Sequence, residues 1–154
     1  MAVREKVKVV GREPGEMRVL VVSDDTELGG LIALNLRQRG FVVEHTDLAM
    51  AQTVRWAPSF HVLDLLIVDL ENHERVSSIH LRRLARQPWA QHVPLLLATE
   101  SSATMVNFLG RIPDIVLSRP ADVADIVAAS RSLLERRGAV TSCWYTLDAN
   151  QVKP

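Results

Sequence analysis

Five polar residues follow short apolar stretches of the chain and could together do chemistry. They are Asp24, Asp25, Asp69, Thr99 and Arg119. Neighbouring carboxylates repel each other unless a cation neutralises them, and Mg²⁺ with oxygen ligands is suited to that task. A phosphoryl group on one of the carboxylates would then meet the metal ion, a hydroxyl and a guanidinium. This combination indicates a site that accepts a phosphoryl group.

The elements that must position these residues alternate along the chain. Apolar runs rich in β-branched residues predict strands over 18–22, 41–45, 63–69, 94–98 and 114–117. Helical spacing of apolar residues predicts helices over 28–36, 47–56, 76–87 and 101–109, and a last helix from Val123 that is capped by Gly138. This alternation predicts an α/β fold whose parallel sheet is covered by helices on both faces.

The order of the strands decides whether the polar residues meet. In a doubly wound sheet of order 2-1-3-4-5, the first and third strands flank the switch point, and sites form beyond the carboxyl ends of the strands. This order brings Asp24 and Asp69 together, with Thr99 and Arg119 at the same end of the sheet. Six residues of the central strands should be buried: Leu20, Val22, Leu65, Ile67, Leu95 and Leu97.

Composition limits the class of protein. The 154 residues are 47% hydrophobic and 23% charged, which suits one folded domain. Lys plus Arg (18) balances Asp plus Glu (18), so no global field favours nucleic acid, and no apolar run is long enough to span a membrane. The lone Cys143 excludes an intramolecular disulfide. We expect a cytoplasmic protein with a flexible lead over 1–16, one domain over 17–138 and a tail over 139–154.

The ordered motifs resemble a known family over about residues 17–137. Val-Leu-Val-Val, Ser-Asp-Asp-Thr-Glu-Leu and Arg-Gly-Phe follow one another between Val19 and Phe41, and Asp-Leu-Leu-Ile-Val-Asp-Leu occupies 64–70. Arg-Arg-Leu at 82–84 and Val-Pro at 93–94 keep the same spacing. The chain is similar to the receiver domains of bacterial two-component response regulators. The resemblance implies a flavodoxin-like fold with a five-stranded parallel sheet of order 2-1-3-4-5.

The resemblance also implies a role for each site residue. Asp69 matches the phosphoacceptor, and Asp24 matches the acid that binds Mg²⁺ directly. Asp25 is a further acidic residue that could assist with the metal ion. Thr99 falls on the switch threonine, and Arg119 replaces the usual lysine, so the positive charge is kept but its geometry differs.

Three departures from the family's pattern predict weak activation. Ser23 stands where the family has its first acid. Glu100 stands where a small residue normally admits the phosphoryl donor; a carboxylate about 6 Å from the phosphoryl group would repel it by roughly 3 kcal/mol per unit charge. Val116 stands where an aromatic switch residue is common.

Two functions from different classes therefore stay open. The first is a stand-alone, atypical receiver domain that acts through protein contacts, with degraded phosphorylation at Asp69. The alternative is an ordinary phosphotransfer receiver, which a histidine kinase phosphorylates at Asp69 with Mg²⁺. A flavodoxin-like ligand binder is disfavoured, because no glycine-rich phosphate loop follows the first strand. Neither of the first two readings makes the protein an enzyme, and its partner would be a histidine kinase or another signalling protein.

Other residues have simpler interpretations. Asp24 and Asp25 could cap the first helix, as Asp often does. Trp56 and Trp89 should fill gaps at helix ends. The segment Cys143-Trp144-Tyr145 could fold back on the last helix, or form a docking or dimer contact. We also expect a homodimer through the fourth helix, fifth strand and fifth helix. The residues expected on that face are Met105, Phe108, Val116, Arg131, Arg136 and Arg137.

Overall fold

The computed structural model describes residues 17–59, 62–70, 78–100, 102–118 and 122–150, with only the backbone for 102 and 137–150. Five strands alternate with five helices in these residues. The strands are β1 (Arg18–Ser23), β2 (Val42–Thr46), β3 (Leu65–Leu70), β4 (Leu95–Thr99) and β5 (Ile115–Ser118). The helices are α1 (Thr26–Arg37), α2 (Leu48–Ala51), α3 (Ser78–Ala85), α4 (Ser102–Leu109) and α5 (Val123–Asn150).

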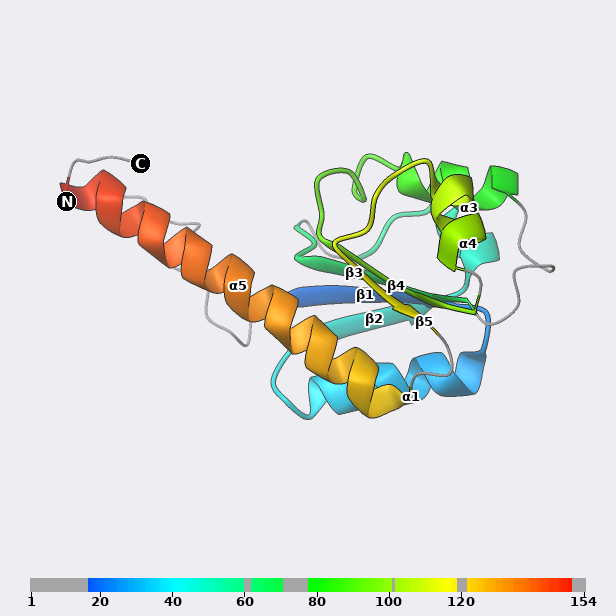
Figure 1. The fold of residues 1–154 in the computed structure, drawn as a ribbon, viewed down its shortest axis with the longest axis horizontal. Helices are drawn as coiled ribbons and strands as arrows, with labels where there is room; N and C mark the ends of the chain where they lie inside the picture. Colours follow the sequence, from blue (N-terminus) through cyan, green and yellow to red (C-terminus); the bar gives the residue numbers. More distant parts are fainter. Residues whose placement is uncertain (1–16, 60–61, 71–77, 101, 119–121, 151–154) are drawn as a thin grey trace.

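All neighbouring strands are parallel, and their order is β2-β1-β3-β4-β5. The predicted fold class and strand order are therefore confirmed. Figure 1 shows α1 and α5 below the sheet, and α3 and α4 above it. The fold is the doubly wound, flavodoxin-like arrangement expected from the sequence.

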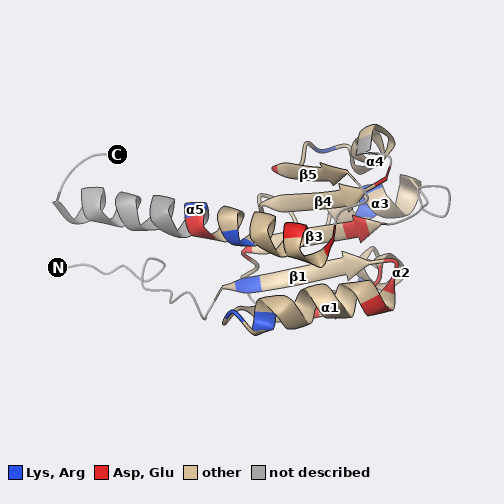
Figure 2. Ribbon diagram, turned by 60° about the horizontal axis from the view of Figure 1, so that its bottom comes forward, with Lys and Arg blue, Asp and Glu red and all other residues tan. Residues whose placement is uncertain are grey.

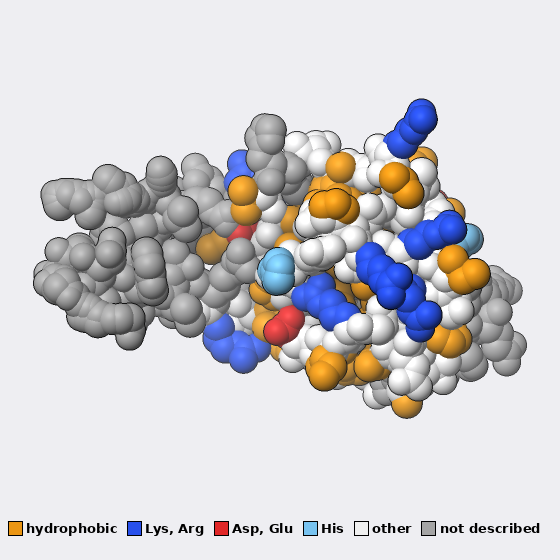
Figure 3. Space-filling view, turned by 90° about the horizontal axis from the view of Figure 1, so that it is seen from above, with side chains coloured by type: hydrophobic (Ala, Val, Ile, Leu, Met, Phe, Trp, Pro, Cys, Tyr) orange, Lys and Arg blue, Asp and Glu red, His pale blue; other side chains and the backbone are white. Residues whose placement is uncertain are grey.

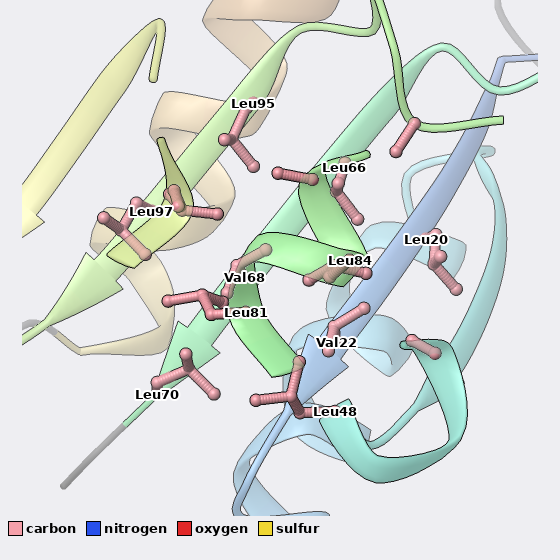
Figure 4. Packing of buried hydrophobic residues seen from close by; sticks show 14 of the residues in the cluster. Leu20, Val22, Leu48, Leu66, Val68, Leu70, Leu81, Leu84, Leu95 and Leu97 are labelled. Carbon is pink, nitrogen blue, oxygen red and sulfur yellow. The ribbon is translucent and has the colours of Figure 1, made fainter. Parts of the chain in front are cut away.

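The sheet separates two apolar layers because side chains alternate between its faces. Leu20, Val22, Leu66 and Val68 face α2, α3 and α4, where Leu81 and other leucines complete the packing (Figure 4). The opposite layer joins Val19, Val21, Leu65 and Ile67 to the buried sides of α1 and α5. The six central-strand residues predicted to be buried are all confirmed as buried.

Two predicted helix ends are wrong. The second helix was expected to reach Trp56, but α2 ends at Ala51 and a turn follows. There the side-chain amide of Gln87 donates hydrogen bonds to the carbonyls of Ala51 (3.1 Å) and Thr53 (2.8 Å), which holds the turn against the end of α3. Trp56 packs edge-on against Trp89, with ring centroids 5.4 Å apart, and both rings lie against the apolar layer above the sheet, although Trp56 is not at the end of a helix.

The second correction concerns the last helix. It does not end at Gly138 but continues to Asn150, and Figure 1 shows its second half extending beyond the sheet. Within the described residues, no helix is both long and apolar enough to cross a membrane.

Candidate functional site

The carboxyl ends of β1, β3 and β4 bring three predicted site residues to one edge of the sheet. Ser23 lies beside Asp69 in the register of β1 and β3, and Leu70 lies beside Thr99 in that of β3 and β4. The backbone N–H of Asp24 donates to the carbonyl of Asp69 at 3.3 Å. Figure 2 shows acidic residues at this edge and at the start of α1. The expected meeting of Asp24 and Asp69 is therefore confirmed.

The two carboxylates differ in exposure. Asp69 is 0% exposed, whereas Asp24 is exposed to solvent. Asp69 follows Leu65 and Ile67 at alternate positions of β3, so its side chain lies on the face that α1 and α5 cover. Burying a carboxylate is costly unless hydrogen bonds or a cation compensate, which makes Asp69 a candidate functional residue.

Local hydrogen bonds occupy the other two polar residues of the β1–α1 turn. The hydroxyl of Ser23 donates to the carbonyl of Asp25 at 2.8 Å and accepts from the N–H of Asp25 at 3.0 Å. The carboxylate of Asp25 is the N-cap of α1, since its Oδ1 accepts from the N–H groups of Glu27 (3.0 Å) and Leu28 (3.1 Å). The capping role weighed for Asp25 is therefore present, and its role in binding metal stays a prediction.

The donor set fits a lightly held Mg²⁺ ion. In the part of the chain that the structure describes, no group of three His, Cys, Asp or Glu side chains could hold a metal ion. The carboxylates of Asp24 and Asp69 do share one edge, and Mg²⁺ is commonly bound by one or two carboxylates while it keeps several waters. These two residues would hold the ion, and it would supply positive charge beside an incoming phosphoryl group.

Residues at the rim of the site are only partly described. Thr99 is buried at the end of β4, and Glu100, which follows it, is exposed. Val116 is 39% exposed on β5. Arg119 directly follows β5 in the sequence and lies outside the described residues, as does the 71–77 segment after β3.

A contact that sequence reasoning missed lies beneath this edge. Gly29, in the first turns of α1, is so close to the sheet that an added Cβ would lie 2.2 Å from Nε2 of His45 and 2.8 Å from Cβ of Ser23. Burial, and then the positive charge of Arg37, lower the pKa of His45 below its ordinary value. The pair Gly29-Gly30 inside an otherwise helical pattern was the available signal, because an interior glycine often marks close packing.

Some residues expected on the surface of the dimer face are buried in the structure. Met105 was expected on its surface, but it is buried in the apolar layer above the sheet, because α4 packs that side against β4 and α3. Phe108 packs partly against the same layer. Arg131 is exposed and lies 3.7 Å from Glu135 one turn along α5. Arg137 has no described side chain.

Comparison with known proteins identifies the family. No protein-family model matches the chain. The response regulator protein PmrA of Pseudomonas aeruginosa is 34% identical over 121 residues, which are 78% of this chain and 53% of PmrA. The chain contains a response-regulator receiver domain. It spans about half the length of the relatives it matches.

Solved structures agree on the fold. The receiver domain of the sensor histidine kinase PA1611 from Pseudomonas aeruginosa PAO1, which has a magnesium ion in its active site cleft, matches 78% of this chain with a TM-score of 0.57 and 18% identity, over 98% of its own length. A structure described as an atypical orphan response regulator with a phosphorylation-independent regulatory mechanism matches 77% of this chain with a TM-score of 0.54 and 20% identity, over 96% of its own length. Receiver domains are signalling modules, and both likenesses concern the fold of the module.

Proposed function

We propose that this receiver domain acts chiefly through protein contacts and that Asp69 accepts a phosphoryl group only slowly. The observation that carries the proposal is the hydrogen bonding of the β1–α1 turn. Ser23 offers a hydroxyl that is already bonded to the backbone of Asp25, and the carboxylate of Asp25 caps α1. The carboxylates of Asp24 and Asp69 share the edge of the sheet, while Asp25 already uses its Oδ1 to cap α1 and Ser23 offers no charge to neutralise a divalent ion. Affinity for such an ion is lower when fewer of its ligands are charged.

Two further residues support weak activation. The exposed Glu100 adds negative charge next to Thr99, and Val116 has no ring that could move when Thr99 turns towards a phosphoryl group. A ligand shifts a conformational equilibrium only by its differential affinity for the two states. A phosphoryl group on Asp69 would therefore cause little change in the conformation of the fourth helix, fifth strand and fifth helix.

The test is labelling by acetyl phosphate, followed by mass spectrometry of the intact chain. We expect slow labelling of the wild type that needs high Mg²⁺, and no labelling of Asp69→Ala. Ser23→Asp combined with Glu100→Ala should raise Mg²⁺ affinity about tenfold, the effect typical of residues around a metal site. Rapid labelling of the wild type at low Mg²⁺ would contradict the proposal.

The second candidate is an ordinary phosphotransfer receiver. The observation in its favour is that Asp24, Asp69 and Thr99 already share one edge of the sheet. A histidine kinase would then pass a phosphoryl group to Asp69 with Mg²⁺. The two candidates differ in partner binding: Asp69→Ala leaves it intact in a constitutive module and abolishes it in a switch.

Partners and location belong to the same proposal. We expect a histidine kinase or another signalling protein as partner, in the cytoplasm, and a homodimer through α4, β5 and α5. Val116 and Arg131 are exposed on β5 and α5 and would lie at that contact. A single monomer in sedimentation experiments at high concentration, with and without residues 139–154, would refute the dimer.

A further inference from the structure

The exposed side of α3 is built from arginines and an isoleucine. Leu81, Leu84 and Ala85 point into the core, so the opposite side of the helix carries Ile79, Arg82, Arg83 and Arg86, the last just beyond its end. Ile79 is 60% exposed, and the three arginines are exposed. Residues three and four apart are neighbours on a helix surface, so these side chains form one continuous stripe.

Neighbouring segments widen this stripe. A guanidinium nitrogen of Arg82 lies 3.3 Å from the carbonyl of Asn107 in α4, and Nε of Arg82 would lie 3.6 Å from a Cβ on Gly110. The next residue, Arg111, donates hydrogen bonds to the carbonyls of Ala90 (2.9 Å) and Val93. Ile112 follows and is 86% exposed. The end of α4 therefore continues the surface that α3 begins.

We call Ile79, Arg82, Arg83, Arg86 and Ile112 the arginine face. Figure 3 looks onto the α3 and α4 side of the molecule and shows blue side chains gathered there, with orange ones among them and few red ones. Between residues 78 and 112 the sequence has four arginines and one acidic residue, Glu100. Glu100 directly follows the carboxyl end of β4.

Among the described residues, the charge of this face has few acidic neighbours. Within the described residues, Arg83 and Arg86 have no carboxylate at ion-pair distance. The whole chain is nevertheless neutral. Positive charge is thus concentrated here, whereas acidic side chains gather at the aspartate edge and the start of α1. Such a separation gives a surface with its own electrostatic preference despite a net charge of zero.

We propose that the arginine face binds an acidic, amphipathic segment of a partner protein. Guanidinium groups pair with carboxylates through two parallel hydrogen bonds, and arginine is enriched at the centres of protein interfaces. The exposed Ile79 precedes the arginines on α3, and the exposed Ile112 follows Gly110, which lies beside Arg82. Both would contact apolar side chains of the same segment. A nucleic-acid backbone would use the arginines but not the isoleucines, so the mixed surface favours a protein partner.

This binding goes beyond the proposed function and does not depend on phosphorylation. The arginine face lies on the exposed side of α3, and Asp69 lies on the opposite face of the sheet, towards α1 and α5. Failure of one proposal therefore leaves the other standing: Asp69→Ala should bind the same segment with unchanged affinity.

The experiment uses the full chain and a fluorescent synthetic peptide. The peptide has leucine every third or fourth residue and glutamate elsewhere, over about four helical turns. Binding is followed by fluorescence anisotropy. We expect the double variant Arg83→Glu with Arg86→Glu to bind about tenfold more weakly. The matched control is Arg37→Glu with Arg39→Glu, which changes the net charge equally on exposed residues at and just beyond the end of α1 and should bind within twofold of the wild type.

Two further probes decide the chemistry of the partner. A peptide of the same composition with its leucines scattered around the helix should bind the wild-type chain several-fold more weakly. The original peptide should bind the Ile79→Ser variant several-fold more weakly as well. A DNA duplex of similar length should bind more weakly than the peptide at physiological salt. The proposal is overturned by absence of peptide binding, by equal losses in the α3 and control variants, by equal binding of the scattered peptide, or by tighter binding of DNA. Circular dichroism verifies that each variant is folded.

Discussion

The two ends of the sheet use aspartate in opposite ways. At the amino end, Asp64 immediately precedes β3, and its Oδ2 accepts a hydrogen bond from the N–H of Arg18 at 2.7 Å while its own N–H donates to the carbonyl of Arg18 at 2.8 Å. Asp114 repeats this arrangement before β5, with both bonds to Leu95 at 2.8 Å. At the carboxyl end, the backbone N–H of Asp24 donates to the carbonyl of Asp69 at 3.3 Å, and the carboxylate of Asp69 is buried.

The two ends of the sheet therefore place aspartates in different surroundings. An aspartate at the amino end satisfies the first N–H of a neighbouring strand, so it joins β1 to β3 or β4 to β5 where each pair begins. At the carboxyl end, the carboxylate of Asp69 is buried, and burying a carboxylate destabilises the fold unless hydrogen bonds or a cation compensate. The same substitution should therefore have opposite effects at the two ends.

The largest effect is expected at Asp64. This residue is 0% exposed, so Asp64→Ala leaves the N–H of Arg18 without its charged acceptor in a place that water does not reach readily. We expect the free energy of unfolding to fall by about 3 kcal/mol. Asp114→Ala removes an equivalent bond at an exposed residue, where water can replace the carboxylate, and should cost about 1 kcal/mol. Urea denaturation measures both, and equal losses would show that burial does not decide the strength of these bonds.

The second effect concerns packing beneath the carboxyl end. Gly29→Ala forces a methyl group against His45 and against Cβ of Ser23, which belongs to a buried strand and has little room to move. We expect a loss of about 2 kcal/mol in unfolding free energy, as for overpacking.

Gly30 provides the matched control for this prediction. A Cβ at Gly30 meets nothing within 4 Å, so Gly30→Ala should stabilise the helix by up to about 1 kcal/mol through helix propensity. Thermal unfolding distinguishes the two variants by sign. Stabilisation by both would mean that α1 does not press against β1 and β2 at Gly29.

The third effect tests how much the buried Asp69 carboxylate lowers the free energy of unfolding. Asp69→Asn keeps the shape of the side chain and removes a buried negative charge, so we expect the free energy of unfolding to rise by about 1 kcal/mol. Asp64→Asn, the same change at the amino end, should lower it. If Asp69→Asn destabilises the domain as much as Asp64→Asn, both ends are structural and the contrast between them fails.

The sequence predicted the fold because its signals are local and repeated. Each apolar run predicts one strand, and each helical pattern predicts one helix. The rule that sites form at the carboxyl ends of parallel strands was enough to place Asp24 and Asp69 together. The β3 position of Asp69 and the buried central strands followed from the same pattern.

Other features depend on contacts that no local pattern encodes. Whether Asp25 caps α1 or binds metal depends on the geometry of one turn, and the closeness of Gly29 to His45 depends on the position of α1 on the sheet. Gly138 resembled a helix cap, but α5 continues through it. The paired bonds of Asp64 and Asp114 also needed the strand register, because their partners are 46 and 19 residues away.

The smallest effect is a dependence on pH at the carboxyl end, through His45. Burial against Gly29, and then the charge of Arg37, lower the pKa of His45 in the folded chain below 6.5, while Asp47 acts in the opposite sense. As pH falls through 6.5, the unfolded chain therefore takes up a proton before the folded chain does. The contribution of His45 to stability is complete above 6.5 and is lost progressively as pH falls from there towards the lower folded pKa. His45→Gln removes the titration, so the difference in unfolding free energy between pH 7.5 and 5.5 should be smaller than in the wild type. An unchanged pH dependence in His45→Gln would mean that the imidazole is as well solvated in the folded chain as in the unfolded one, and that α1 leaves it room at Gly29.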